Sequence, residues 1–293
     1  AIEKLGRGRY LSAKVPFSYD YYDKDNDAND DVSGHGTHVS GIAAGCVLSD
    51  DGAYEFAGSA PGAQILALKV FSSDPAERGT SSDVYLAALE DAYTLGADVI
   101  NMSLGAQNGF VYDGIEEKVL NGIFTTLDDA GVICCLKHFP GYGNNVDTHT
   151  GIAVDQRPLE SFTSSDFLPF QAGMESGGGK TAVLVSHNIM TAVDGDLPAS
   201  LSPKVHGLLR TDLGFDGVVM TDDLAMEAVA AYSADGAVAV MALEAGNDLV
   251  ITTDYRTQIP KVLEALESGA LSEETIDTAC RRVLTWKQNL GLL

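Results

Sequence analysis

Side chains that could transfer protons are concentrated in two segments of the second half of the chain. The first segment begins with Lys137 and His138, continues through a glycine-rich stretch and ends with Asp147 and His149. In an extended chain, residues two apart project to the same side, so Asp147 can hydrogen-bond His149 and raise its basicity. This spacing predicts a histidine that is tuned for proton transfer.

The second segment ends an apolar run, residues 217–221, with the adjacent carboxylates Asp222 and Asp223. A charge at the end of a buried strand is costly unless it is used or paired. Asp222 is therefore a candidate nucleophile. The alternative is that it caps the following helix, because Asp is a favoured N-cap residue. Asp223 is expected to form such a cap or to accept a backbone N–H.

The remaining candidates in this half are histidines and zinc-type ligands. His187 and His206 are interpreted as structural, with substrate contact as the alternative for His187. The residues that a zinc site could use are His138, Asp147, His149 and Asp222. Their spacing matches no familiar metal motif, so we expect no metal and no other cofactor.

The first half holds one histidine in a setting that could serve catalysis. His35 stands between two glycines at the start of an expected helix of small residues, within residues 33–45. As a general base it would need a serine to deprotonate, an acid to orient it and oxyanion donors. A structural histidine is the alternative.

Two other patterns match ligand sites only in part. Residues 177–181 look like the end of a phosphate loop, but they precede an expected strand, whereas a phosphate loop precedes a helix. The acidic stretch from Asp20 to Asp31 alternates oxygens as in a calcium loop, but the twelfth position from Asp23 is Gly34, where a calcium loop needs Glu. A turn is expected in the first case, and in the second a calcium loop and a solvated acidic loop both stay open.

Short apolar or β-branched runs alternate with segments of helical period, as in βαβ units. The expected strands are residues 64–71, 98–104, 132–137, 181–187, 217–221 and 247–252, with 15–22 as a seventh. The expected helices, besides the one at His35, are residues 82–95, 114–130, 202–213, 226–245 and 257–268. This alternation predicts an α/β fold with a mainly parallel sheet, in which ligands bind at the carboxyl ends of the strands.

The composition is that of a globular chain, 45% hydrophobic and 20% charged over 293 residues. Acidic residues outnumber basic ones 42 to 18, for a net charge of −24. A surface this negative repels nucleic acid and anionic lipid, so neither is an expected partner. No apolar run approaches the roughly 18 residues that span a bilayer. The N-terminus lacks the apolar core of a signal peptide, which predicts a cytoplasmic chain or a secreted one without its leader. The four cysteines are expected to be reduced core thiols.

Residues 131–293 resemble the family 3 glycoside hydrolases, in particular the β-N-acetylglucosaminidase branch. The resemblance rests on residues 137–149 and 221–226, supported by residues 186–188, 197–202, 213–217 and 245–249. It implies a retaining hydrolase in which Asp222 attacks the anomeric carbon and Asp147 with His149 acts as general acid and base. It also implies that Lys137 and His138 bind sugar hydroxyls.

Residues 15–135 resemble the subtilisin-like serine proteases, through residues 33–45, 60–70 and 97–105. The resemblance implies that His35 occupies the position of the general base, and that Ser103 and Gly105 belong to a strand edge that pairs with substrate. The aspartate strand and the serine motif of that family have no counterpart in this sequence. A base without a nucleophile is not expected to cleave peptides.

The two resemblances meet within residues 114–137, which predicts a chimera of segments 1–130 and 131–293 that could pack as one domain. Six or seven strands fall short of the eight that close a barrel. The expected fold is therefore a partial or distorted (βα)8-type barrel joined to a subtilisin-like half sheet. An open sheet edge could support a homodimer.

The expected function is retaining cleavage of terminal β-linked N-acetylglucosamine from a small sugar or glycan substrate. Weak or no activity is expected, because the first half barrel, which completes the sugar subsite, is missing. The alternatives are a non-catalytic α/β scaffold or chimera and a degenerate subtilisin-like serine peptidase.

Overall fold

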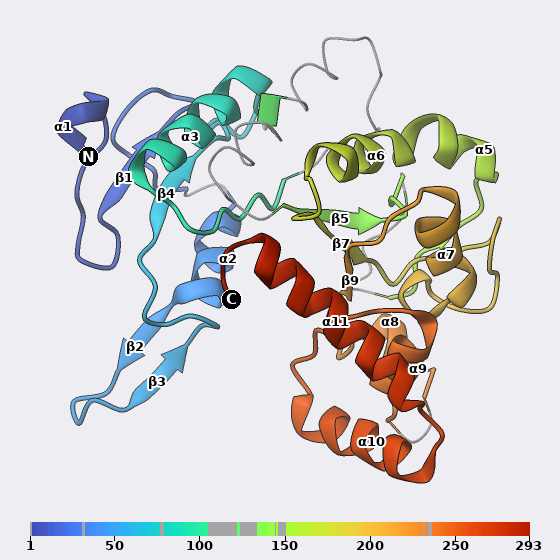
Figure 1. The fold of residues 1–293 in the computed structure, drawn as a ribbon. Coiled ribbons are helices and arrows are strands. Elements are labelled where there is room, and N and C mark those ends of the chain that lie inside the picture. Colours follow the sequence, from blue (N-terminus) through green and yellow to red (C-terminus); the bar gives the residue numbers. More distant parts are fainter. Residues whose placement is uncertain are drawn as a thin grey trace. The chain divides into compact units, whose positions relative to one another are not determined.

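The structure is a computed structural model that describes residues 2–30, 33–76, 79–104, 122–123, 134–143, 145, 151–230, 232–233 and 236–293. The chain divides into two compact units, Ala1–Leu104 and Gly105–Leu293 (Figure 1). The boundary expected near residue 130 lies outside the described residues and stays a prediction.

The first unit is built on two parallel strands and one long helix. Strand β1 (Phe17–Asp20) pairs with β4 (Leu66–Lys69), and α3 (Ser82–Leu95) buries Ala88, Leu89 and Ala92. The unit also contains α1 (Ile2–Leu5), α2 (His35–Ala44) and a hairpin of β2 (Cys46–Leu48) and β3 (Tyr54–Ala57). The strands expected at 15–22 and 64–71 are confirmed, and so are the helices at His35 and at 82–95.

A buried carboxylate ties α3 to the start of the chain and to β1. Asp91 Oδ2 accepts hydrogen bonds from Arg7 Nε and the Tyr21 hydroxyl, both at 2.7 Å, and Oδ1 accepts one from Arg7 Nη2 at 2.9 Å. Burial alone would raise the pKa of Asp91, but the bonds from Arg7 and Tyr21 lower it below its ordinary value. The carboxylate therefore stays charged inside the unit.

The strand expected at residues 98–104 is wrong. These residues form no strand, and Val99 is 81% exposed. A strand needs a paired neighbour and a buried face, and in the described part of the first unit the parallel sheet consists of β1 and β4 alone. Among the residues that the structure describes, the apolar run therefore has no strand to pair with.

Carboxylates of the acidic loop accept hydrogen bonds from the backbone of the same loop. Asp20 Oδ1 accepts hydrogen bonds from the N–H groups of Tyr22 and Asp23, and Asp25 Oδ1 accepts one from Asp27. Asp20 also pairs with Lys69. In the ranges that the structure describes, no three His, Cys, Asp or Glu side chains gather as metal ligands.

The second unit centres on a three-stranded parallel sheet in the order β5 (Cys135–Phe139), β7 (Ala182–Val185) and β9 (Val218–Thr221) (Figure 1). Its register places Phe139 beside Val185 and Val185 beside Thr221. The short strands β6 (Val154–Asp155) and β8 (Ile189–Met190) form a separate parallel pair. The expected strands at 132–137, 181–187 and 217–221 are confirmed, as is the mainly parallel pairing. No closed barrel forms among the described residues.

The helices of this unit include several one-turn and π-helical pieces. They are α5 (Leu159–Ser161), η2 (Phe162–Asp166), α6 (Phe167–Ser176), η3 (Ala199–Leu201), α7 (Pro203–Gly207), η4 (Leu208–Asp212), α8 (Glu227–Ala230), α9 (Val238–Ala245), α10 (Tyr255–Ser268) and α11 (Glu273–Asn289). The helix expected at 257–268 is confirmed, and the one at 202–213 is present as α7 and η4. The helix expected at 226–245 is divided into α8 and α9, and Gly236 before α9 has a φ of 78°, outside the helical range.

Residues 247–252 run beside β9 but are not the expected strand. One parallel bridge, Met220 with Leu249, is formed. Side chains take the place of further ladder bonds: the N–H of Val219 donates to Asp248 Oδ2 and that of Ile251 donates to Thr221 Oγ1, both at 2.9 Å. Polar side chains in the segment thus compete with strand pairing.

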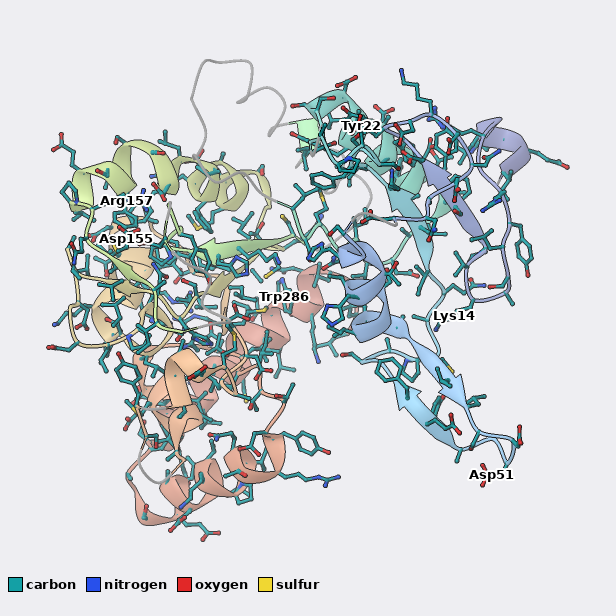
Figure 2. The ribbon with its side chains drawn as sticks, turned by 180° about the vertical axis from the view of Figure 1, so that it is seen from behind. Lys14, Tyr22, Asp51, Asp155, Arg157 and Trp286 are labelled. Atoms are coloured by element: carbon teal, nitrogen blue, oxygen red, sulfur yellow. The ribbon has the colours of Figure 1, made fainter. Side chains whose placement is uncertain are left out.

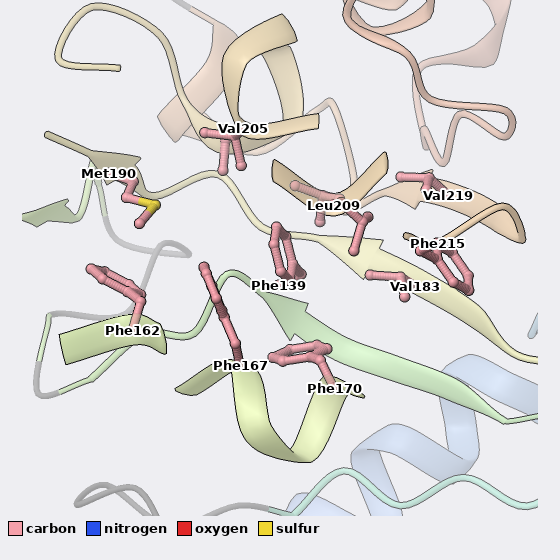
Figure 3. Close-up of a cluster of buried hydrophobic side chains, with 12 residues drawn as sticks. Phe139, Phe162, Phe167, Phe170, Val183, Met190, Val205, Leu209, Phe215 and Val219 are labelled. Atoms are coloured by element: carbon pink, nitrogen blue, oxygen red, sulfur yellow. The ribbon is translucent and has the colours of Figure 1, made fainter. Parts of the chain in front are cut away.

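An aromatic core fixes the end of β5. Phe139 is fully buried, stacks on Phe167 with ring centroids 5.3 Å apart and meets Phe170 edge-on at 5.2 Å. Figure 3 shows Leu209 on the other side of Phe139. Because Phe139 ends the strand, this packing also holds the backbone of the preceding Lys137 and His138.

All four cysteines are free, as expected, but the expected burial is wrong. Cys46, Cys135 and Cys280 are exposed and Cys134 is half-buried. Cys46 lies in a hairpin whose strand residues are all exposed, and Cys280 lies in α11, where Ala279 is the buried residue. In the described residues, no helix is both long and apolar enough to cross a membrane.

His206 gives the second unit a pH-dependent stability. It is 3% exposed, and its Nδ1 donates to the Ser202 carbonyl at 2.9 Å. Burial lowers the pKa of His206 below its ordinary value. The unfolded chain binds a proton below about pH 6.5 while the folded chain resists it, so this stability is present above that pH and is lost as pH falls.

We expect His206→Asn, which keeps an N–H donor and removes the titration, to flatten this pH dependence. The free energy of unfolding in urea would be compared at about pH 7 and about pH 5.5 for both proteins. The wild type should lose more stability than the variant over this interval. An equal loss in the two would contradict the assignment to His206.

Candidate active site

The carboxyl ends of β5, β7 and β9 bring the predicted site segments to one edge of the sheet. The Ser186 N–H, just after β7, donates to the Phe139 carbonyl at 2.9 Å, and the Asp222 N–H, just after β9, donates to the Val185 carbonyl at 3.0 Å. Parallel pairing therefore places residues 137–138, 186–188 and 222–223 beside one another. This is the edge at which parallel sheets bind ligands.

A bulge in β5 lies at Lys137 and His138. Leu136 is opposite Val183 and Phe139 is opposite Val185, so three steps along β5 match two along β7. Bulges break the alternation of strand side chains and are common beside active sites. Lys137 is exposed and His138 is partly exposed at this position.

The structure brings His138 and Asp222 together. Nε2 of His138 lies 3.9 Å from Oδ2 of Asp222, and the two side chains are 28% and 19% exposed. The other oxygen of Asp222 accepts a hydrogen bond from the N–H of Asp223 at 2.9 Å. The His138 ring also meets the ring of Tyr142 edge-on, at 5.3 Å between centroids. A partly buried carboxylate beside an imidazole is suited to attack on an electrophilic carbon. The imidazole is then a nearby hydrogen-bonding group.

His187 supports the turn that carries Asp222. It is fully buried, with Nδ1 at 2.7 Å from Ser200 Oγ and Nε2 at 3.0 Å from the Asp223 carbonyl. A carbonyl only accepts, so Nε2 carries the proton and the Ser200 hydroxyl donates to Nδ1. This placement favours the structural interpretation of His187 over the substrate contact that the sequence allowed.

Asp223 has the turn-forming role expected of it. Its Oδ1 accepts hydrogen bonds from the N–H groups of Ala225 and Thr253, at 2.9 and 3.0 Å. These bonds join the turn after β9 to the segment that precedes α10. The side chain of Asp222 thus stands on a turn that is fixed from two directions, by His187 and by Asp223.

The remaining predicted site residues fall into two groups. Asp147, His149 and Gly105 lie outside the described residues, so the acid/base dyad and the zinc set that includes it stay predictions. In the described part of the first unit, no hydrogen bond joins the exposed imidazole of His35 to a serine or a carboxylate. Ser103 there shares hydrogen bonds with Asn101.

Arg157 is a residue that sequence reasoning missed. It pairs with two carboxylates, those of Asp155 and Asp166. The available signal was an acid and an arginine two residues apart, a pattern that also occurs on solvated surfaces. Only the fold reveals that the Asp155 side chain is buried and that the Asp166 side chain is only 10% exposed.

We expect Ser200→Ala to destabilise the chain by about 1–3 kcal/mol, because it leaves the buried Nδ1 of His187 without a donor. Ser164→Ala is the matched control, since the Ser164 hydroxyl is exposed and bonds a local carbonyl. The control should change stability by less than about 0.5 kcal/mol. Denaturant unfolding measures both, and equal stabilities for the two variants would contradict the role given to Ser200.

Comparison with known proteins finds the same two families that the motifs resemble. Residues 107–286 match the model of the glycosyl hydrolase family 3 N-terminal domain, and residues 10–148 match the model of the subtilase family. A β-hexosaminidase of Stenotrophomonas maltophilia (strain K279a) is 36% identical over 150 residues, which is 50% of this chain and 43% of that protein. A PI-type proteinase of Lactococcus lactis subsp. cremoris is 42% identical over 104 residues, which is 35% of this chain and 6% of that protein.

Solved structures give the same family for the fold. A family 3 β-N-acetylglucosaminidase from Paenibacillus sp. str. FPU-7 matches with a TM-score of 0.61 and 30% identity, covering 72% of this chain and 44% of that one. The β-N-acetylglucosaminidase from Thermotoga maritima matches with a TM-score of 0.60 and 27% identity, covering 78% and 53%. The matched segments span less than half the length of the β-hexosaminidase and of the proteinase described above. The chain also carries a subtilase-like segment, residues 10–148, that overlaps the start of the glycosidase match. With a family model matched over more than half of its residues, the chain belongs to the family 3 glycoside hydrolases.

Proposed function

We propose that the second unit is a retaining glycosidase for terminal β-linked N-acetylglucosamine, with Asp222 as the nucleophile. The observation that carries the proposal is the position of Asp222. Its partly buried carboxylate lies at the carboxyl end of β9, with Oδ2 at 3.9 Å from Nε2 of His138. The printed names of the β-hexosaminidase and β-N-acetylglucosaminidase relatives support the choice of sugar.

The proposed reaction has two displacements. Asp222 attacks the anomeric carbon and forms a glycosyl-enzyme, while His149, assisted by Asp147, protonates the leaving oxygen. The same histidine then removes a proton from the water that hydrolyses this intermediate. An imidazole can exchange protons in both directions near neutral pH.

Lys137 and His138 are proposed to hold sugar hydroxyls next to Asp222. Both stand at the β5 bulge, and His138 already lies beside the Asp222 carboxylate. His187 is proposed to act on the sugar only indirectly, because it is fully buried and holds the Asp222 turn.

We propose that the activity is weak. The described residues form a three-stranded sheet in place of a closed barrel, so fewer strand ends surround the sugar. Fewer contacts leave the ring less well oriented, and orientation supplies a large part of the rate. Peptide cleavage is not proposed, because the sequence has no counterpart of the subtilase serine motif.

We expect Asp222→Ala to abolish turnover of nitrophenyl N-acetylglucosaminide. Loss of a nucleophile costs on the order of 10⁴-fold or more in rate, which would take a weak activity to background. Asp216→Ala is the matched control, an exposed carboxylate just before β9, and it should keep the wild-type rate.

Exposure to a fluorosugar inactivator provides a second readout. The wild type and Asp216→Ala should gain the mass of one sugar, and Asp222→Ala should gain none. Identical turnover in the wild type and Asp222→Ala would remove Asp222 from the mechanism. Absence of both turnover and adduct in the wild type would favour a non-catalytic scaffold.

A further inference from the structure

The rings of His138 and Tyr142 contact each other within the candidate site. Their centroids are 5.3 Å apart and their planes meet at 80°, an arrangement that aromatic rings favour over face-to-face stacking. Nε2 of the same imidazole lies 3.9 Å from Oδ2 of Asp222. That separation is longer than a hydrogen bond, so Asp222 does not by itself fix the orientation of the imidazole.

A short turn brings Tyr142 back to His138. The Gly141 N–H donates to the His138 carbonyl at 2.8 Å, which closes a four-residue turn. Gly141 has a φ of 109°, which residues other than glycine rarely adopt. Its carbonyl accepts a hydrogen bond from Nδ2 of Asn188 at 3.4 Å, and Asn188 is fully buried. The turn is therefore tied to the segment that follows β7.

An ionic cluster around Arg157 lies behind this turn. Arg157 donates from Nη1 and Nη2 to the two oxygens of Asp166, each at 2.9 Å, and from Nε and Nη2 to Asp155 at 2.8–3.1 Å. The side chains of Asp155 and Asp166 are 1% and 10% exposed. Figure 2 shows Asp155 and Arg157 next to each other. A bidentate pair of this kind fixes the plane of the guanidinium.

The glycines on the two sides of Tyr142 pack directly on the cluster. A Cβ added to Gly143 would lie 2.7 Å from the guanidinium carbon of Arg157, and one added to Gly141 would collide with the Asp166 carboxylate. The backbone that carries Tyr142 is thus supported on both sides of the residue. The support leaves the Tyr142 ring in contact with the imidazole of the candidate site.

We propose that Tyr142 is a positioning residue for His138, because its ring holds the imidazole beside the Asp222 carboxylate. The role rests on the proposed function, in which His138 binds a sugar hydroxyl next to the nucleophile. Tyr142 acts through its ring, which contacts the imidazole, and not through its hydroxyl group. Phenylalanine would therefore keep the role, whereas leucine would place an apolar side chain there without an aromatic ring.

A double-mutant cycle separates positioning from a general effect on the fold. Tyr142→Leu should lower kcat/KM for nitrophenyl N-acetylglucosaminide by about three- to tenfold, the range expected for loss of an aromatic pair. In a His138→Ala background, the same substitution should change kcat/KM by less than about 1.5-fold, because no imidazole is left to position. Tyr142→Phe should stay within about twofold of the wild type.

Tyr255→Leu is the matched control, since Tyr255 is a 51% exposed tyrosine at the start of α10. It should keep the wild-type kcat/KM. All rates are referred to the folded fraction, which urea unfolding measures. A loss by the same factor in the wild-type and His138→Ala backgrounds would overturn the proposal, because Tyr142 would then act independently of His138.

NMR tests the positioning without any activity. Three-bond couplings from the backbone nitrogen and carbonyl carbon to Cγ of His138 report its χ1 rotamer. The wild type and Tyr142→Phe should show the couplings of a single rotamer, and Tyr142→Leu should show values averaged over several. Single-rotamer couplings in Tyr142→Leu would overturn the positioning role. Averaged couplings in that variant together with an inactive wild type would instead reject the proposed function and leave the positioning role standing.

Discussion

The parallel register of β5, β7 and β9 is the constraint on which the candidate site depends. It brings three carboxyl ends to one edge, and the bonds from Ser186 to Phe139 and from Asp222 to Val185 extend the alignment one residue past the strands. Phe139, the last residue of β5, stabilises this edge by packing on Phe167 and Phe170. Moving β5 by one residue would exchange the faces on which its side chains lie and would separate His138 from Asp222.

Electrostatic pairing allows a chain of net charge −24 to bury carboxylates. In the described residues, each buried aspartate has a cationic side chain within ion-pair distance. These aspartates are Asp20, Asp91, Asp155, Asp194 and Asp248. Asp222 differs from them, because it is partly exposed and its neighbour is a histidine, whose charge depends on pH. In the proposed mechanism this partly exposed carboxylate meets the substrate, whereas the five paired ones stabilise the fold.

The sequence was sufficient for the parts of the fold that have strong local patterns. The apolar runs before Ser186 and Asp222 are strands, and residues 82–95 form a helix with the predicted limits. It failed where tertiary partners decide. Residues 98–104 are as apolar as a strand but have no paired neighbour within the described ranges. Residues 247–252 bond β9 through the side chains of Asp248 and Thr221. For the site, the motifs predicted that His138 and Asp222 serve one substrate, but the Arg157 cluster depends on burial, which spacing alone does not reveal.

The two family matches overlap at residues 107–148, so one stretch of chain satisfies both models. Both families use alternating strands and helices, and a helix followed by a strand fits either pattern. In the proposed mechanism, the second unit cleaves its substrate by double displacement at Asp222. The most direct test is proton NMR of the first sugar released from a β-linked N-acetylglucosaminide. Double displacement predicts that the β-anomer appears first and then mutarotates. Initial release of the α-anomer would contradict it, because a single displacement by water inverts the anomeric carbon.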